Sequence, residues 1–356
     1  MAQFFIYSEK SFRNDKKSYK TFLIICRKEG TMKNRILNTK SLFLLFISIT
    51  ILILTGCNNS PTGPQQAQST ADQQAMLKVI ESDSAVASFT PNYNEESAMN
   101  IIGKTSVAIY PFQVGQKMRL VSKNFTYTMV GDTAFGTYTA TFEGVLYIEA
   151  SYDSTTRTQD TLIQKPFTTV ITRKVILLKL NNSRYDTTNF DWRVLAISLP
   201  SGGTLNSNIQ ITKLTMYMPD GSVVIINDPN DYYLMRGQMG GKMHGHRGWG
   251  MMPDFLHDQK VTIQATVSSA YADTDFVTLT HGARLDGMNR QKLELHLVSS
   301  TPSGSGYVKV YEGTFVTHSF PGFSTAVINA FPRQVIYDDS TPVEADTWGV
   351  PYFIER

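Results

Sequence analysis

The chain has 356 residues, with 33 lysines and arginines against 30 aspartates and glutamates, and a formal net charge of +3. The basic excess lies at the N-terminus. Removing the ten basic and three acidic residues of positions 1–56 leaves 23 basic and 27 acidic residues, a net charge of −4. A chain processed there loses the main electrostatic support for nucleic-acid binding. Cys26 and Cys57 are the only cysteines, so the same processing excludes an internal disulfide.

Residues 32–56 have the layout of an export signal. Three basic residues precede residues 42–54, a run of thirteen apolar or weakly polar residues. This run is shorter than the roughly 20 apolar residues of a membrane span, and it fits the apolar region of a signal peptide. Met32 stands directly before the signal. We therefore interpret residues 1–31 as an upstream extension from a misplaced start codon and exclude them from reasoning about the fold.

The apolar run ends in the segment LTGC, residues 54–57. This segment resembles the lipobox of bacterial lipoproteins, in which small residues lead into a cysteine. The resemblance implies that the Cys57 sulfur carries a diacylglyceryl group, that the chain is cut before Cys57, and that the new amino terminus is acylated, for example with palmitate. Two or more acyl chains hold a protein firmly on a membrane. Asn58 takes the place of the aspartate that signals inner-membrane retention in some bacteria, which favours the outer membrane. The alternative is a single-pass anchor followed by an incidental cysteine.

Residues 57–69 are polar with two prolines, and we expect a flexible tether there. The next segment, TADQQAMLKVIES at residues 70–82, has the apolar stripe of an amphipathic helix. From about residue 107 the apolar period changes to two. Residues 136–150 alternate large apolar residues with threonine and glutamate, which predicts a half-buried antiparallel strand. Further strands are predicted at 166–180 and 191–200.

Residues 70–202 resemble the nuclear-transport-factor-2-like (SnoaL-like) cone fold. The resemblance is carried by the N-terminal helix, the segment GDTAFGTYTATFEG and the closing segment WRVLAIS. It implies an α+β domain, a helix plus a curved antiparallel sheet, that can enclose a small-molecule pocket. Some members of that family are enzymes with an acid or base inside the cone. All six histidines of this chain lie at or after His244, outside this segment, and Asp132 fits a turn. A generic antiparallel α+β domain is the alternative.

Residues 201–208, SGGTLNSN, are predicted to join this domain to a second one. Residues 203–356 contain many short period-two runs with regular turns, which predicts an antiparallel β-sandwich of immunoglobulin-like architecture. A hairpin is expected at Pro219-Asp220-Gly221. The strand faces rich in serine and threonine are expected to face solvent. The predicted fold class is therefore α+β followed by all-β.

Residues 235–252, MRGQMGGKMHGHRGWGMM, form a long glycine-rich loop with five methionines and two histidines. Thioether sulfur and imidazole are ligands for copper, and similar methionine-rich segments occur in periplasmic copper-handling proteins. Three basic side chains in the same loop oppose a cation site, so a flexible interaction loop is the stronger interpretation. The candidate soft-metal ligands are Met239, Met243, His244 and His246.

The leading hypothesis is a non-enzymatic, lipid-anchored cell-envelope protein that binds a ligand or an envelope protein partner. One alternative is copper handling through the loop. The other is small-molecule binding or catalysis in a pocket of residues 70–202. No catalytic triad motif, phosphate loop or HExxH motif is present. His281 and His318, near predicted strand ends, are expected to have structural roles.

Overall fold

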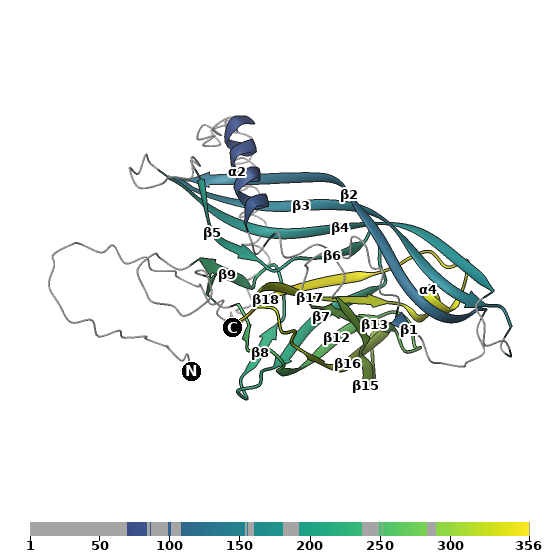
Figure 1. Ribbon diagram of the computed structural model, residues 1–356. Coiled ribbons are helices and arrows are strands. Elements are labelled where there is room, and N and C mark those ends of the chain that lie inside the picture. Colours follow the sequence, from purple (N-terminus) through teal and green to yellow (C-terminus); the bar gives the residue numbers. More distant parts are fainter. Residues whose placement is uncertain are drawn as a thin grey trace, which may run out of the picture. The chain divides into compact units, whose positions relative to one another are not determined.

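The computed structural model describes residues 70–83, 86, 99–100, 108–153, 155, 160–180, 192–236, 249–250, 252–282 and 290–355 (Figure 1). The chain divides into two compact units, Met1–Gln66 and Ala67–Arg356, and every residue described belongs to the second.

Strands dominate this unit. They make up 66% of the described residues, which contain two short helices, α2 (Thr70–Ser82) and α4 (Arg333–Tyr337). The predicted α+β class for residues 70–202 is therefore wrong, because a single helix accompanies a sheet of long strands there. The β-rich, sandwich-like character predicted for the rest of the chain is confirmed.

The larger sheet has thirteen strands. Its main path is β1 (Met99–Asn100), β2 (Tyr110–Val130), β3 (Thr133–Ser151), β4 (Thr161–Lys179), β6 (Ser201–Thr204), β18 (Asp346–Ile354), β17 (Gly322–Phe331), β13 (Phe276–His281) and β14 (Gln291–Glu294). Four short strands pair beside this path: β5 (Trp192–Ser198) on β4, β9 (Tyr233–Arg236) on β5, β10 (Trp249–Gly250) on β9, and β11 (Asp254–Phe255) on β18.

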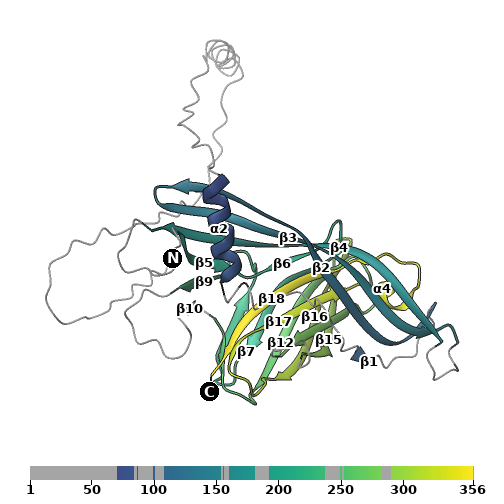
Figure 2. The ribbon, with the colours of Figure 1, turned by 45° about the horizontal axis from the view of Figure 1, so that its top comes forward.

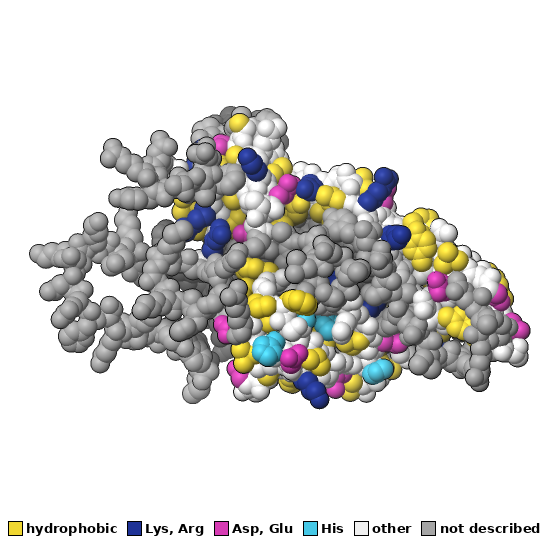
Figure 3. Space-filling view, in the orientation of Figure 1, with side chains coloured by type: hydrophobic (Ala, Val, Ile, Leu, Met, Phe, Trp, Pro, Cys, Tyr) yellow, Lys and Arg dark blue, Asp and Glu magenta, His cyan; other side chains and the backbone are white. Residues whose placement is uncertain are grey.

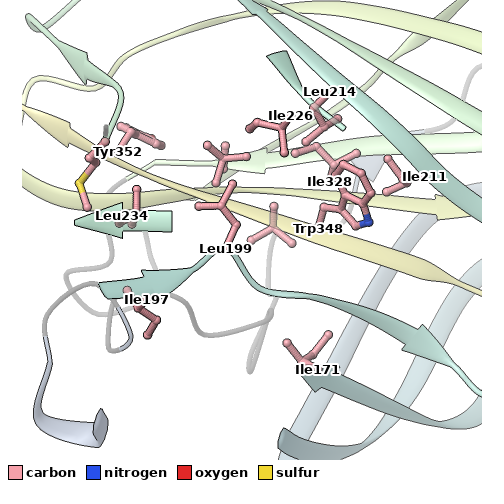
Figure 4. Packing of buried hydrophobic residues seen from close by; sticks show 14 of the residues in the cluster. Ile171, Ile197, Leu199, Ile211, Leu214, Ile226, Leu234, Ile328, Trp348 and Tyr352 are labelled. Atoms are coloured by element: carbon pink, nitrogen blue, oxygen red, sulfur yellow. The ribbon is translucent and has the colours of Figure 1, made fainter. Parts of the chain in front are cut away.

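The smaller sheet has five strands and packs on one face of the central strands of the larger sheet (Figure 2). Its order is β15 (His296–Ser303), β16 (Gly306–Val316), β12 (Lys260–Ser269), β7 (Ile209–Tyr217) and β8 (Val223–Ile226). The predicted turn at Pro219-Asp220-Gly221 joins β7 to β8, and Gly221 has the positive φ of 85° that favours glycine. Figure 4 shows Leu214 and Ile226 of this sheet packed against Ile328 and Trp348 of the larger one.

The long hairpins β2–β3–β4 follow from strict alternation in the sequence. Every even residue of β3 from Tyr138 to Ala150 is buried, and the odd residues are partly or fully exposed, as the period-two pattern predicts. On the buried face, α2 covers one end of these strands with Met76, Val79 and Ile80, its predicted apolar stripe. Gln73 of α2 donates a hydrogen bond from Nε2 to the Phe125 carbonyl oxygen at 2.7 Å, which ties the helix to β2.

At the other end of β4, a buried lysine holds α4. Lys165 Nζ donates to the carbonyl oxygens of Val335 (2.8 Å), Thr341 (2.9 Å) and Asp338. Burial lowers the pKa of Lys165, and the nearby charges of Asp338 and Asp339 oppose that shift. Three carbonyl acceptors thus stabilise the ammonium group and fix the end of α4 against the sheet.

Strand β6 connects β4 on one side to β18 on the other, so residues 70–202 and 203–356 contribute strands to the same sheet. The predicted boundary between residues 202 and 203 falls inside this strand. A Cβ atom added to Gly202 would lie 1.8 Å from the Val170 carbonyl oxygen, and one added to Gly203 would lie 2.1 Å from the Ala345 carbonyl oxygen. Neither neighbour is a flexible side-chain end, so only glycine fits at both positions.

Asp346 of β18 joins the two sheets. Its Oδ2 accepts a hydrogen bond from the backbone N–H of Ile211 in β7 at 2.7 Å. Burial raises the pKa of this carboxyl from 3.8 to about 7, although the N–H groups of Ile211 and Thr347 favour the charged form. Between about pH 4 and pH 7 the native state therefore holds a proton on Asp346 more often than the unfolded chain does.

We predict that Gly202→Ala and Gly203→Ala each lower the free energy of unfolding by about 3 kcal/mol, because a backbone shift must relieve the overlap. Urea unfolding followed by circular dichroism measures this, with Leu205→Ala, at a position 73% exposed just after β6, as the control. A change below about 1 kcal/mol for both glycine variants would show that β6 tolerates a side chain.

We also predict that Asp346 makes stability fall as pH rises from about 4 to about 7. Over this range the folded protein retains the proton and the unfolded chain loses it, so deprotonation costs at most about 4 kcal/mol. Asp346→Asn keeps an acceptor for Ile211 and removes the titration, so its stability curve is flatter and lies above that of the wild type at pH 8. Unfolding at pH 4.5 and pH 8 tests this, with the exposed Asp273→Asn as control. Parallel curves for wild type and Asp346→Asn would contradict the assignment.

Candidate functional site

Four polar side chains stand opposite one another across four adjacent strands. Glu294 of β14 pairs with Thr278 of β13, Thr278 with Asn329 of β17, and Asn329 with Thr347 of β18. Directly opposed residues of antiparallel strands have their side chains on the same face. These four residues form one line, which we call the polar row.

The polar row lies on the face of the larger sheet that turns away from the smaller sheet. Phe276 and Phe331 lie on the same face of the sheet as the row, two residues along their strands from Thr278 and Asn329. They pack with Leu146 of β3 and Val335 of α4. The alternate residue Ile328 packs on the opposite face, against the smaller sheet (Figure 4). In Figure 1, β2, β3 and β4 extend over this face, with α2 near one end of them and α4 near the other.

Three of its four side chains are closed to solvent, with exposures of 0% for Thr278, 2% for Asn329 and 7% for Thr347, and Glu294 at the end of the row is partly exposed. One hydrogen bond forms within it, from Thr347 Oγ1 to Asn329 Oδ1 at 2.7 Å. Within the described part of the chain, Thr278 Oγ1 and Asn329 Nδ2 have no hydrogen-bond partner. A buried polar atom without a partner destabilises a fold by about 1–3 kcal/mol. The row therefore contains a buried hydroxyl and a buried amide donor whose hydrogen bonds are not satisfied by the described residues.

The charge of the row is low. Burial raises the pKa of Glu294, and the charges of His296 and Arg333 partly oppose this shift. The threonine and asparagine side chains are neutral. Because the row has hydroxyl and amide groups with one carboxyl at its end, it suits a ligand that both donates and accepts hydrogen bonds and that carries no net charge.

Polar groups continue onto the facing side of β4. Thr347 connects through Gly202 of β6 to Ile171 of β4, and Thr169 and Arg173 lie two residues away from Ile171 on the same face. Thr169 Oγ1 has no hydrogen-bond partner among the described residues. Burial lowers the pKa of Arg173 to about 9, and the charges of Asp83 and Tyr138 oppose the shift. The guanidinium thus remains protonated at neutral pH.

His281 and His318, far apart in sequence, belong to one aromatic cluster. The His281 ring lies 4.7 Å from the Phe315 ring, and the His318 ring lies 6.4 Å from the Tyr352 ring, centre to centre. Burial lowers the pKa of His281 to about 4, with a smaller contribution from the charge of His318, and burial also lowers the pKa of His318. Both imidazoles are therefore neutral at neutral pH. No three histidine, cysteine or acidic side chains converge on a metal position in the ranges that the structure describes.

The predicted ligands of the alternative, soft-metal hypothesis lie outside the described residues. These are Met239, Met243, His244 and His246, and the lipid-anchor residue Cys57 also lies outside them. Both flanks of the loop are described. Arg236 and Met235 of β9 pair with Trp249 and Gly250 of β10. The soft-metal site and the lipid anchor stay predictions.

The sequence matches no protein-family model, and it has no significant match among curated proteins. In the residues that the structure covers, neither helix is long and apolar enough to cross a membrane. The functional argument therefore depends on the residues of this chain alone.

The polar row was not predicted from the sequence, for an identifiable reason. Threonine-rich strand faces were expected to face solvent. Thr137 of β3 is exposed as expected, but Thr278 and Thr347 are buried. Threonine favours strands on either face, so its presence does not indicate burial. One local signal was present in β13. Its segment FVTLTH combines apolar residues and threonines and contains no Asp, Glu, Lys or Arg. All six of its residues are buried.

We predict that two identical substitutions in the row have opposite effects on folding without ligand. Thr278→Val removes a buried hydroxyl without a partner and stabilises the protein by about 1 kcal/mol or more. Thr347→Val removes a formed hydrogen bond and leaves Asn329 Oδ1 unsatisfied, which destabilises by about 1–2 kcal/mol. Thermal unfolding of both variants measures this. A loss of stability in Thr278→Val would show that its hydroxyl is satisfied in solution.

Proposed function

We propose that the protein is a non-enzymatic, lipid-anchored binding protein of the bacterial cell envelope, held at the outer membrane through Cys57. Its ligand is a neutral polar molecule that binds along the polar row. The observation that carries the proposal is the buried hydroxyl of Thr278 and the buried amide of Asn329, which have no partner among the described residues. The lipobox segment at residues 54–57 supports the anchor.

Two physical arguments support binding. First, leaving donors unsatisfied in a closed interior lowers stability, and a ligand that satisfies them recovers that free energy on binding. Second, Phe276 and Phe331 on the same face, with ring centres 6.4 Å apart, place apolar surface beside the polar groups. Ligand sites commonly combine an apolar wall with a few placed polar groups. Sugars have both hydroxyl donors and acceptors and apolar C–H faces, and they match this chemistry.

Entry of the ligand requires local opening, because Thr278, Asn329 and Thr347 are closed to solvent. Association is then slower than the roughly 10⁵–10⁷ per molar per second of preformed surfaces. The same opening favours a small ligand over a folded protein partner.

Ligand binding is tested by thermal shift on the processed lipoprotein in detergent. The probes are neutral mono- and oligosaccharides, with sulfated and phosphorylated sugars as the charged comparison. We predict that a neutral sugar at 100 times its dissociation constant stabilises the protein by about 2.7 kcal/mol and that charged sugars have a smaller effect. Isothermal titration then gives the dissociation constant.

The variant Thr278→Val/Asn329→Leu removes both available polar groups and is expected to weaken binding at least tenfold. Thr137→Val, an exposed threonine of β3, is the matched control and should bind as the wild type does. Binding of equal strength in the double variant, or failure of every neutral sugar at millimolar concentration, would rule out the polar row as the site.

The anchor has its own test. Metabolic labelling with an alkyne fatty acid, followed by mass spectrometry of the membrane fraction, is predicted to find acyl groups on Cys57 at the mature N-terminus. Cys57→Ser should abolish both labelling and membrane association. A membrane-bound and unlabelled Cys57→Ser protein would instead support a single-pass anchor.

A further inference from the structure

The turn between β2 and β3 and the strands beside it expose apolar side chains at one end of the larger sheet. Val130, the last residue of β2, is 68% exposed, Phe135 of β3 is 45% exposed and Met235 of β9 is 48% exposed. The register connects Phe135 to Met235 through Ile176 of β4 and the buried Ala196 of β5. We call the three exposed side chains, Val130, Phe135 and Met235, the tip surface.

A shallow hollow lies in the tip surface. It has a volume of about 330 Å³ and is lined by Phe135, Ile176 and Tyr233, with Lys174 and threonines of β2 and β3 around them. Lys174 forms an ion pair with Asp231 at 2.6 Å, so the charges near the hollow are balanced. A surface of this kind attracts apolar groups and has no strong preference for an anionic partner.

The tip surface lies at the end of the sheet where the chain enters from the N-terminus. Asp72, in the first turn of α2, lies 3.4 Å from Lys179 Nζ and 3.3 Å from Trp192 Nε1. The Lys179 N–H in turn donates to the carbonyl oxygen of Asp132, in the β2–β3 turn, at 2.8 Å. The start of α2 and the turn are thus neighbours. Figure 3 shows hydrophobic, basic and acidic side chains near α2 at this end.

Chain length then limits how far this end can lie from the lipid. Residues 57–69 are thirteen residues, which span at most about 45 Å when fully extended. Strand β2 has 21 residues and is about 70 Å long. Under the proposed function, acyl groups on Cys57 therefore keep the start of α2 and the turn beside it within about 45 Å of the bilayer, whereas the opposite end of β2 can lie about 70 Å farther away.

We propose that the tip surface rests in the headgroup region of the phospholipid bilayer that holds the Cys57 lipid. This inference depends on the proposed lipid anchor. Three partly exposed apolar side chains are far below the roughly 800 Å² per partner of a stable protein interface, so a second protein is a poorer occupant. They suffice to orient a protein that acyl chains already hold. Since the charges are balanced, the contact is insensitive to salt.

The experiment uses the processed lipoprotein on phosphatidylcholine vesicles that contain a spin-labelled lipid quencher. Cys26 and Cys57 are the only natural cysteines, and processing removes the first and acylates the second, so an introduced cysteine carries a fluorescent dye uniquely. One dye is placed in the turn by Asp132→Cys. The other is placed by Leu162→Cys at the opposite end of the sheet, where residue 162 is 47% exposed. We expect the lipid to quench the turn dye about threefold more than the distant dye, in low and high salt.

Val130→Ser/Phe135→Ser is expected to reduce the quenching of the turn dye to the level of the distant dye. The control Val121→Ser/Val316→Ser changes side chains that are 51% and 46% exposed elsewhere, and it should leave the quenching unchanged. Equal quenching of the two dyes in an acylated, vesicle-bound protein overturns this inference alone. Absence of acyl groups and of vesicle binding overturns the proposed anchor together with it.

Discussion

The arrangement of the larger sheet depends on how closely three backbones approach at β6. One edge of β4 has two partners: Thr169–Thr172 pair with β6, and Val175–Lys179 pair with β5. The same β6 residues, 201–203, also pair with β18 on their other side. The short contacts at Gly202 and Gly203 are the result, since a Cβ at either position would overlap a neighbouring carbonyl. The position of β6 between β4 and β18 determines where β18, β17 and β13 lie relative to β4. It therefore also determines the face that carries the polar row.

That placement buries the central strands on both faces. Strands of this kind are expected to be almost wholly apolar, as β13 residues Val277 and Leu279 are. The polar row departs from this rule. The same fold does satisfy buried polar groups elsewhere. Lys309 and Asp275 form a fully buried ion pair at 2.9 Å, and Ser269 and Tyr311 donate further hydrogen bonds to Asp275.

The contrast separates structural polar groups from candidate functional ones. Asp275 has a partner for each oxygen, and burial raises its pKa against the opposing interaction with Lys309. Thr278 Oγ1 and Asn329 Nδ2 have none among the described residues. Apolar side chains at these two positions would give the protein a higher free energy of unfolding, so folding alone does not explain the polar ones. A binding role gives a physical reason for keeping them.

Local patterns were enough to predict the elements, and insufficient for their pairing. The helix at 70–82, the alternation of β3 and the hairpin at Pro219-Asp220-Gly221 follow from side-chain period and turn chemistry within a few residues. The prediction of an α+β class was wrong because a helix followed by period-two strands occurs with many types of sheet, and this pattern does not determine the fold class. The polar row could not be predicted, because its members come from strands up to 69 residues apart and meet only through register.

The two proposed surfaces lie in different parts of the sheet, and their separation bears on the ligand. The polar row meets β4 at Ile171, eight residues before Lys179, which lies beside the β2–β3 turn. Eight residues of strand correspond to about 26 Å. The headgroup region on one side of a bilayer is only about 5–8 Å thick. When β4 runs along the membrane normal, a tip resting on lipid therefore holds the buried polar row at a level beyond the headgroups. A site held there meets water-soluble molecules of the envelope and is out of reach of acyl chains in the bilayer, which agrees with the neutral hydrogen-bonding chemistry of Thr278 and Asn329.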